Sequence, residues 1–403
     1  MKLLTVTMTV ALGLIFAGLQ PVLAAPAASI SLSPASGPAG SAVTVSGTGF
    51  KASVSGTVAA GPTAFTFRTT ATGAFSTSIT IPSSAAGTVT VTAKTSSVKA
   101  SSVFTVMQAA PELPPVSTAA LRFGVGVPGG PLAAGELDEV SRLAGESPSS
   151  VLFYKDFLQV PPIAEMNAAR ARGAVPLVTW EPWAWGGGVD QPVYALDRIA
   201  AGDFDAHLSR WGQALAAWGY PVQLRFAHEM NGDWYPWAEG VNGNGAGDYV
   251  QAWRHVHDVV AAAGASNVSW VWSPNVPYWG STDLAGLYPG AGYVDVVALD
   301  GYNWGTSASW SGWISPQDLF APGIAELRSL APGLPILIAE TSSSELGGSK
   351  AAWNSDLVSY LAAQPDVVGF VWFHIRKEAD WRINSSDASA AAFKSALAAR
   401  RAS

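Results

Sequence analysis

The segment Ile336-Leu337-Ile338-Ala339-Glu340 is an apolar run that ends in an acidic residue, as expected of a buried strand whose last side chain reaches a polar edge. Seven other segments have a similar apolar core, and Ala-rich amphipathic stretches such as 249–263 and 350–363 separate several of them. The eight expected strands are 121–127, 151–156, 175–181, 222–229, 268–274, 294–301, 334–341 and 367–375. Eight strand–helix units in about 280 residues predict a closed (β/α)8 barrel. A doubly wound open sheet is the alternative, but no Gly-rich dinucleotide turn follows the first strand.

The chain before the barrel has a different composition. No acidic residue occurs before Glu112, and all 17 tryptophans lie at or after Trp180. Short stretches of alternating apolar residues recur at 42–47, 64–68, 75–81 and 88–93, with Gly, Pro and Ser between them. This pattern predicts an antiparallel sandwich over residues 25–107. The expected fold class is therefore α/β, with a barrel over residues 121–400 preceded by a small all-β domain.

Two further segments lie outside these domains. Residues 1–24 have a positive start at Lys2, a mostly apolar stretch and a small-residue cleavage site, which together predict a secretory signal. A membrane anchor is the alternative, but the uninterrupted apolar run is short for a span of about 18 residues, and no later stretch reaches that length. Residues 108–120 contain three prolines and predict a stiff linker. We therefore expect a secreted protein with no membrane attachment after cleavage.

The charge balance and the residue types exclude several classes of protein. Lys plus Arg total 22 and Asp plus Glu total 29, and the resulting net charge of −7 argues against a nucleic-acid binder. Cysteine is absent, so disulfides and cysteine-ligated metal sites are excluded. His228-Glu229 begins a zincin-like pattern, but Gly232 stands where a second His is required. We therefore expect no metal site.

Two glutamates end expected strands, at the face where barrels hold their functional groups. In the stretch Arg225-Phe226-Ala227-His228-Glu229, alternation places Arg225 and Glu229 on one face. Glu340 lies on the face shared by Ile336 and Ile338. Both carboxylates can then point into the same mouth, although a salt-bridged structural role is the alternative for either one.

Two facing carboxylates meet the requirement for glycoside hydrolysis, in which one donates a proton and the other is ionised. Sugars also stack on flat aromatic rings, and nine tryptophans fall in or near expected loops: Trp180, Trp183, Trp185, Trp234, Trp237, Trp279, Trp304, Trp310 and Trp313. We therefore interpret the barrel as a hydrolase of a polysaccharide. A non-catalytic polysaccharide-binding or surface-adhesion protein is the alternative, but binding alone needs no carboxylate pair.

Four motifs are similar to those of glycoside hydrolase family 26: residues 225–237, Ile338-Ala339-Glu340-Thr341, Asp300-Gly301-Tyr302-Asn303-Trp304, and 380–386. The resemblance implies a (β/α)8 barrel and a retaining double displacement without cofactor. It further implies that Glu229 is the acid/base and Glu340 the nucleophile. By the same resemblance, Tyr302 hydrogen-bonds the nucleophile, His228 supports the acid/base site, Trp372 floors the subsite of the distorted sugar, and Trp234 and Trp237 line the leaving-group side.

The resemblance leaves the polysaccharide open. Mannanases of the family commonly have Trp-His near the end of an early strand, where this chain has Trp180-Glu181. We expect an endo-hydrolase of β-1,4-mannan, with mixed-linkage β-glucan and then β-1,3-xylan as alternatives, and with Arg225, Trp180 and Glu181 contacting the substrate. We also expect a monomer. Residues 34–50 resemble the opening of bacterial immunoglobulin-like modules of the IPT/TIG type, whose expected role here is that of a spacer.

Overall fold

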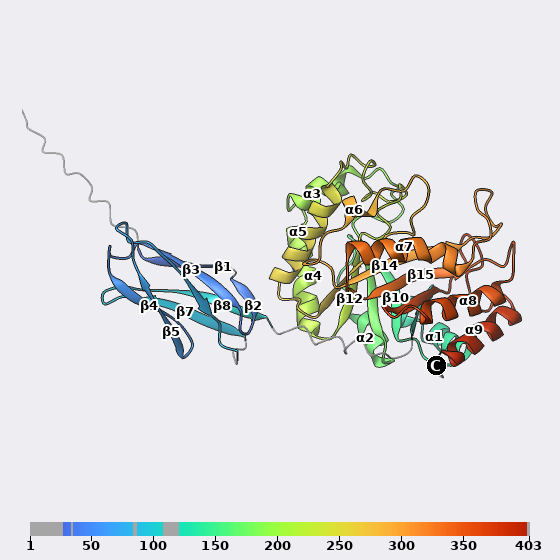
Figure 1. Cartoon of the computed structure of the whole chain (residues 1–403), viewed down its shortest axis with the longest axis horizontal. Helices are drawn as coiled ribbons and strands as arrows, with labels where there is room; N and C mark the ends of the chain where they lie inside the picture. The colour runs from blue at the N-terminus through green and yellow to red at the C-terminus, as the bar shows by residue number, and fades with distance from the viewer. Residues whose placement is uncertain (1–26, 34, 84–86, 108–120, 401–403) are drawn as a thin grey trace, which may run out of the picture. The chain divides into compact units, whose positions relative to one another are not determined.

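The computed structural model describes residues 27–33, 35–83, 87–107 and 121–400 (Figure 1). The chain divides into two compact units, residues 1–107 and 108–403, and each is described by itself. The predicted signal over 1–24 and the predicted linker over 108–120 lie outside the described residues. Within the described residues, no helix is both long enough and apolar enough to span a membrane.

The first unit is a sandwich of two sheets. The smaller sheet has the order β1-β3-β6 and the larger β2-β8-β7-β4-β5. Side chains alternate between exposed and buried along β3 and β7, so that Val45, Val58, Val91 and Phe104 meet in a core between the sheets. The bounds are β1 Ser29–Ser33, β2 Ser36–Pro38, β3 Ala42–Thr48, β4 Ser55–Ala60, β5 Thr63–Arg68, β6 Phe75–Thr80, β7 Thr88–Lys94 and β8 Lys99–Met107. The predicted all-β sandwich is confirmed.

The second unit is a closed barrel of eight parallel strands in the order β9 to β16, with β16 pairing to β9. Each expected strand is present, and the predicted (β/α)8 fold is confirmed. The strands are β9 Arg122–Gly126, β10 Ser150–Asp156, β11 Val175–Glu181, β12 Val222–Phe226, β13 Val268–Trp272, β14 Val296–Asn303, β15 Ile336–Ser343 and β16 Val367–Phe373.

Helices surround the barrel, as Figure 1 shows for α4, α5, α7, α8 and α9. Their apolar faces pack on the outside of the strands, where Trp211, Trp253 and Trp353 are buried. The helices are η1 Gly130–Leu132, α1 Ala134–Ala144, α2 Ile163–Ala171, η2 Pro192–Tyr194, α3 Leu196–Ala200, α4 Asp205–Trp218, α5 Asp248–Ala262, α6 Leu284–Leu287, α7 Pro316–Leu330, α8 Lys350–Ala362 and α9 Asp387–Ala399.

Strand alternation decides which side chains face the barrel mouth. The interior holds a separate small cluster that includes Leu152, Leu177, Ala298 and Val371. Positions two or four residues further along the same strands share that inward face, because successive side chains alternate. Tyr154, Glu181, Asp300 and Phe373 therefore point toward the mouth, whereas residues one position away point outward.

The direction of Glu340 is explained by a β-bulge. Ile336 and Ile338 pack in the outer cluster against the helices, and Leu337 and Ala339 lie in the barrel interior. The expectation that Glu340 shares the face of Ile336 and Ile338 is therefore wrong. Leu299 pairs with Ile338 but Asp300 pairs with Glu340, so Ala339 is an extra residue in β15. A bulge of this kind re-aims the next side chain, and Glu340 turns inward.

The fourth barrel strand is shorter than predicted. β12 ends at Phe226, and the backbone then enters the left-handed region at Ala227 (φ 44°) and Glu229 (φ 53°). The argument that Arg225 and Glu229 share a strand face is therefore wrong. The turn is held by two backbone bonds, from Ala227 N to Trp180 O (3.0 Å) and from Glu229 N to Ser273 O (2.7 Å). Left-handed backbone at two non-glycine residues is strained, a feature found at functional sites.

Candidate active site

The Glu340 carboxylate is surrounded by hydrogen-bond donors. Its Oε1 accepts from the Tyr154 hydroxyl (2.7 Å) and from the Arg225 guanidinium, and its Oε2 accepts from the Tyr302 hydroxyl (2.6 Å). Glu340 keeps 6% of its surface exposed at the mouth. Charge-assisted bonds of this kind are matched to an ionised carboxylate, which is the form a nucleophile requires.

Beneath Glu340 lies a buried network centred on Arg225. Besides Glu340, Arg225 donates from Nη1 to Asp300 Oδ2 (2.7 Å) and from Nε to Thr179 Oγ1 (2.9 Å). Ser273 Oγ donates to the other oxygen of Asp300 at 2.9 Å. Arg225 has no exposed surface, so the prediction that it binds substrate is wrong in this structure. It is a positioning residue that fixes Glu340.

Glu229 has very different neighbours. Trp234 Nε1 donates to its Oε2 (2.9 Å), and Asn275 Nδ2 donates to its Oε1 (3.0 Å). Removal from water raises the pKa of Glu229 to about 7, and the nearby charge of Glu340 acts in the same direction, against the two hydrogen bonds and Arg225. A carboxyl group with this pKa holds its proton near neutral pH and can give it to a leaving oxygen.

Glu181 is a third carboxylate at the mouth. Its Oε2 accepts from Trp183 Nε1 (3.2 Å) and Trp185 Nε1 (2.5 Å), and no described residue donates to its Oε1. Burial is the main reason that its pKa rises to about 7. Arg225 and Glu340 act on it electrostatically, so it lies near Glu340. Trp185 is 46% exposed. Glu181 can therefore offer a hydrogen-bond acceptor to a sugar, and Trp185 can offer the face of its ring.

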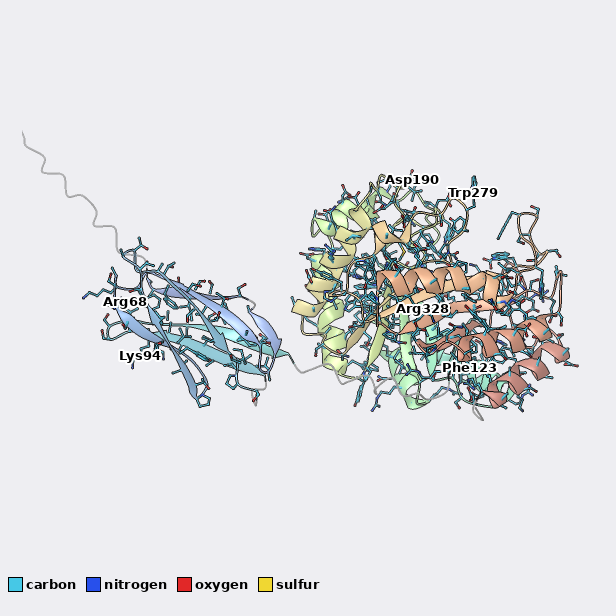
Figure 2. The ribbon with its side chains drawn as sticks, viewed as in Figure 1. Arg68, Lys94, Phe123, Asp190, Trp279 and Arg328 are labelled. Carbon is cyan, nitrogen blue, oxygen red and sulfur yellow. The ribbon has the colours of Figure 1, made fainter. Side chains whose placement is uncertain are left out.

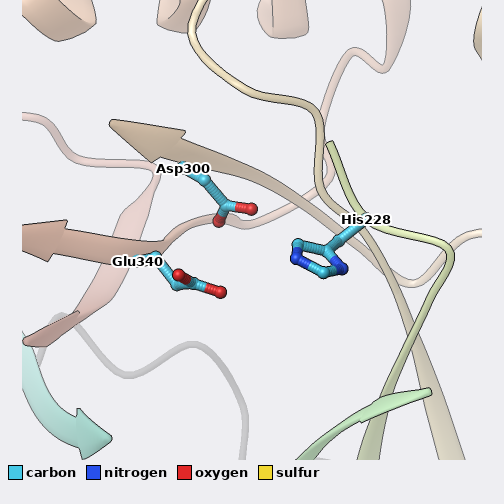
Figure 3. Close-up of side chains that lie close together, drawn as sticks. All are labelled: His228, Asp300 and Glu340. Atoms are coloured by element: carbon cyan, nitrogen blue, oxygen red, sulfur yellow. The ribbon is translucent and has the colours of Figure 1, made fainter. Parts of the chain in front are cut away.

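His228 lies at the bottom of the mouth. One of its ring nitrogens and one oxygen each of Asp300 and Glu340 lie within 4.8 Å of one another (Figure 3). Burial and the charge of Arg225 lower the pKa of His228 well below its usual value, so the ring is neutral. His228 packs between Tyr154 and Tyr235. Its role beside the acid/base site stays a prediction. Arg225 already bridges both carboxylates, so we interpret Asp300 and Glu340 as an ion-pair network rather than metal ligands. No described residue forms a hydrogen bond with His228 Nδ1.

Three residues that were predicted to contact substrate are fully buried. Trp180 alternates outward on β11 and stacks on Trp211 at 4.3 Å. Trp372 alternates outward on β16, packs against Phe393 and donates to Trp381 O (2.8 Å). Trp237 is fully buried and donates to His228 O (2.6 Å), so it braces the turn that holds Glu229 instead of lining an exposed surface. The predictions that these three residues contact sugar are therefore wrong in this structure.

Other aromatic residues are exposed near the catalytic groups. Trp234, which bonds Glu229, stacks on Tyr278 at 5.9 Å, and both are more than one third exposed. Trp279 is 99% exposed, and Figure 2 shows it at the edge of the barrel domain. On the side of Tyr302, a second series of rings runs through Trp381 and Trp304 to Trp310, which is 72% exposed. Flat exposed rings suit the C–H faces of sugars.

Sequence reasoning missed three members of the site. Tyr154 lies two residues beyond Leu152 on β10, and Leu152 points into the barrel interior. The alternation of side chains along a strand could therefore have predicted that Tyr154 points inward too. Asn275 follows the end of β13, where polar residues of a barrel gather. Asp300 belongs to a recognised motif, but its bond to Arg225 joins strands far apart in the sequence and has no local signal.

Comparison with known proteins agrees with this geometry. Residues 172–322 match the model of glycosyl hydrolase family 26. Endoglucanase H of Acetivibrio thermocellus is 41% identical over 249 residues, which cover 60% of this chain and 26% of that protein. Mannan endo-1,4-beta-mannosidase A and B of Caldalkalibacillus mannanilyticus is 41% identical over 90 residues, 21% of this chain and 17% of that protein.

The fold is also found among solved structures. The catalytic domain of a family 26 endo-beta-1,4-mannanase from Bacillus sp. JAMB-750 superposes with a TM-score of 0.53 at 18% identity, covering 70% of this chain and 86% of that one. The chain spans about a quarter or less of the length of the curated relatives above. The matched residues include Arg225, Glu229 and Asp300, which the fold brings to one mouth with Glu340. The barrel of this chain is therefore similar to glycoside hydrolase family 26, with the family match lying over residues 172–322.

Proposed function

We propose that the barrel is an endo-acting β-glycan hydrolase that works by double displacement. The observation that supports this most strongly is the contrast between two carboxyl groups at one mouth. Glu229 has a pKa of about 7, whereas Glu340 accepts from one guanidinium and two hydroxyls. One acid that holds a proton and one that is ionised are the two groups the reaction needs.

In the first step of the proposed reaction, Glu229 gives its proton to the glycosidic oxygen while Glu340 attacks the anomeric carbon. The bond to the leaving sugar breaks, and a glycosyl ester forms on Glu340. Glu229 is then ionised and takes a proton from water, which attacks the anomeric carbon and releases Glu340. Arg225 bonds Oε1 and Tyr302 bonds Oε2 of Glu340, so together they keep the carboxylate oriented toward the sugar in both steps.

We propose a β-glucan as the preferred polysaccharide, which reverses the order expected from the sequence and makes β-1,4-mannan the second candidate. The relative named as an endoglucanase matches 60% of this chain, whereas the relative named as a mannosidase matches 21%. Glu181 further supports this order, because a carboxylate stands where family mannanases commonly have histidine. Mannan remains the second candidate because it is the substrate named for several relatives of the barrel.

A panel of polysaccharides tests both parts of the proposal. Release of reducing ends from mixed-linkage β-glucan, β-1,4-mannan and β-1,3-xylan should be fastest with the glucan, and early products should be mixtures of oligosaccharides. Proton NMR of the first products should show the β-anomer, since double displacement retains configuration. The α-anomer would contradict the mechanism, and faster hydrolysis of mannan would reverse the substrate order. Binding to the panel without hydrolysis would support an adhesion protein instead.

We also propose that the chain is secreted, that the mature protein begins at Ala25, and that it is a monomer. The apolar stretch and small-residue site before Ala25 support cleavage there. Expression of the full chain in a secreting host, followed by N-terminal sequencing and light scattering, tests all three statements. A chain that still begins at Met1 and stays in the cell membrane fraction would contradict secretion and cleavage before Ala25. A mass twice that of the chain would contradict the monomer.

A further inference from the structure

The outer face of the larger sheet in the first unit is covered with hydroxyl groups. Strand pairing sets Thr57 opposite Thr66 and Thr92 opposite Ser101, while Val58 and Val91 alternate into the core. The outward positions of β4, β5, β7 and β8 contain no aromatic residue; they include Ser55, Thr57, Thr66, Thr88, Thr90, Thr92, Ser101 and Thr105. Without rings this face cannot stack on a neutral sugar, so any ligand must be recognised by hydroxyls and charge.

The cations of this unit gather at one end of the same face. Lys94 pairs directly opposite Lys99. Arg68 pairs with Ser55 and Lys94 with Thr57, so Arg68 and Lys94 share the outward side, separated by two strand spacings and an offset of two residues, about 12 Å in all. Lys51 is nearby, because its carbonyl accepts from Thr69 Oγ1 at 2.7 Å. All four side chains are exposed, and Figure 2 shows Arg68 and Lys94 at the same end of the module.

No acidic residue of the module neutralises these charges, since the first acidic residue of the chain is Glu112. Like charges directly opposite each other on neighbouring strands destabilise a sheet. At separations near the Debye length of about 10 Å, their potentials also add. The first 107 residues contribute +5 to a total of −7, so the rest of the chain has −12. The module is therefore the part of an acidic protein that attracts a polyanion.

We propose that this face, defined by Arg68, Lys94, Lys99 and the neighbouring hydroxyl rows, is a docking surface for a carboxylate-bearing polysaccharide. The cations pair with the carboxylates of uronic acid residues, and the threonine and serine hydroxyls exchange hydrogen bonds with the sugar hydroxyls between them. A phosphate polymer such as poly(glycerol phosphate) offers charge but no sugar ring for the hydroxyl rows. The surface is separate from the barrel mouth and does not depend on the proposed catalytic function.

The test uses the full chain and polygalacturonate, with binding read as retardation in affinity electrophoresis at low ionic strength. The wild-type protein should be retarded despite its net charge of −7. The double variant Lys94→Gln/Lys99→Gln should bind roughly 10- to 30-fold more weakly, on the basis of about 1 kcal/mol for each cation near an anionic surface. Retardation should also fall as added salt shortens the Debye length. A matched control, Arg210→Gln/Lys394→Gln, removes two exposed barrel cations and should bind as the wild type does.

Three results would overturn the proposal: no retardation of the wild type, an equal loss in the control variant, or binding to poly(glycerol phosphate) as tight as to polygalacturonate. The first would leave the module as a spacer. Unfolding midpoints show whether each variant is folded. Hydrolysis of a soluble neutral β-glucan should be the same in all three proteins, so a failure of the docking surface is distinguishable from a failure of the catalytic proposal.

Discussion

The Glu340 carboxylate accepts from a guanidinium and two phenols, whereas the Glu229 carboxylate accepts from a neutral indole and a neutral amide. Glu340 also lies within strand β15, whose pairing with β14 has a bulge, and Glu229 lies on a strained turn beyond a strand end. The two side chains are chemically identical. The difference teaches that the positions of the strand ends decide which neighbours each carboxyl group has, and that the neighbours of Glu229 favour its protonated form.

The largest effect should follow from removing the charged partner. Glu340→Gln should lower kcat by about 10⁵-fold or more, because no nucleophile then remains. Reducing-end release from β-glucan measures this loss. The matched control is Glu139→Gln, the same substitution at a partly exposed glutamate of α1, and it should retain activity. A Glu340→Gln variant that is folded and nearly as active as the control would show that the comparison assigns the wrong nucleophile.

The next effect concerns the proton-holding partner. Glu229→Ala should lower kcat/KM on polysaccharide by roughly 10²- to 10⁴-fold, the usual worth of general acid catalysis. An aryl glycoside with a good leaving group needs little protonation, so its cleavage should lose much less. Parallel assays of the two substrates in the wild type and the variant check this difference. An equal loss on both substrates would contradict the role of Glu229 as the acid.

The buried cation should matter for stability as well as activity. Arg225→Met leaves Asp300 and Glu340 without their shared partner and should lower the free energy of unfolding by about 3–5 kcal/mol. Urea denaturation measures this change. Arg142→Met removes an exposed pair with Glu139 and should leave the urea midpoint almost unchanged. If both variants shift the midpoint equally, the network beneath Glu340 does not hold the mouth together.

The smallest effect should be a shift in the pH profile. Glu229 must be protonated to act as the acid, so kcat/KM should fall as pH rises through its pKa of about 7. Trp234 stabilises the charged form of Glu229, so Trp234→Phe should raise that pKa and move the basic limb to higher pH. Phenylalanine keeps a ring beside Tyr278. A limb that stays in place or moves to lower pH would show that the indole bond does not tune Glu229.

Much of this comparison could be predicted from the sequence, and the failures have physical causes. Eight apolar segments were enough for the barrel, because strand periodicity and spacing are local properties. The direction of Glu340 was expected correctly for the wrong reason, since the extra residue Ala339 in β15 is visible only in the pairing with β14. Trp180 and Trp372 were placed at the mouth although each alternates outward. A shift of one residue along a strand moves a side chain to the opposite face of the sheet, and this decides whether a ring can bind sugar or is buried in the core.

The surroundings of the two carboxylates were beyond sequence reasoning for another reason. The contacts of Glu340 come from Tyr154, 186 positions away, and from Arg225, 115 positions away. Barrel closure brings these strand ends together, and no local pattern marks the pairing. Glu229 could be placed near the mouth by its motif, but its raised pKa depends on desolvation by the folded turn.

Covalent trapping tests the assignment of the two carboxylates most directly. A β-glucoside with fluorine in place of the 2-hydroxyl and with a good leaving group should form a glycosyl ester that turns over slowly. Mass spectrometry of the labelled protein, followed by peptide mapping, should place one sugar on Glu340 and none on Glu229 or Glu181. A label on either of those two residues would contradict the account, as would inactivation of the wild type without any covalent adduct.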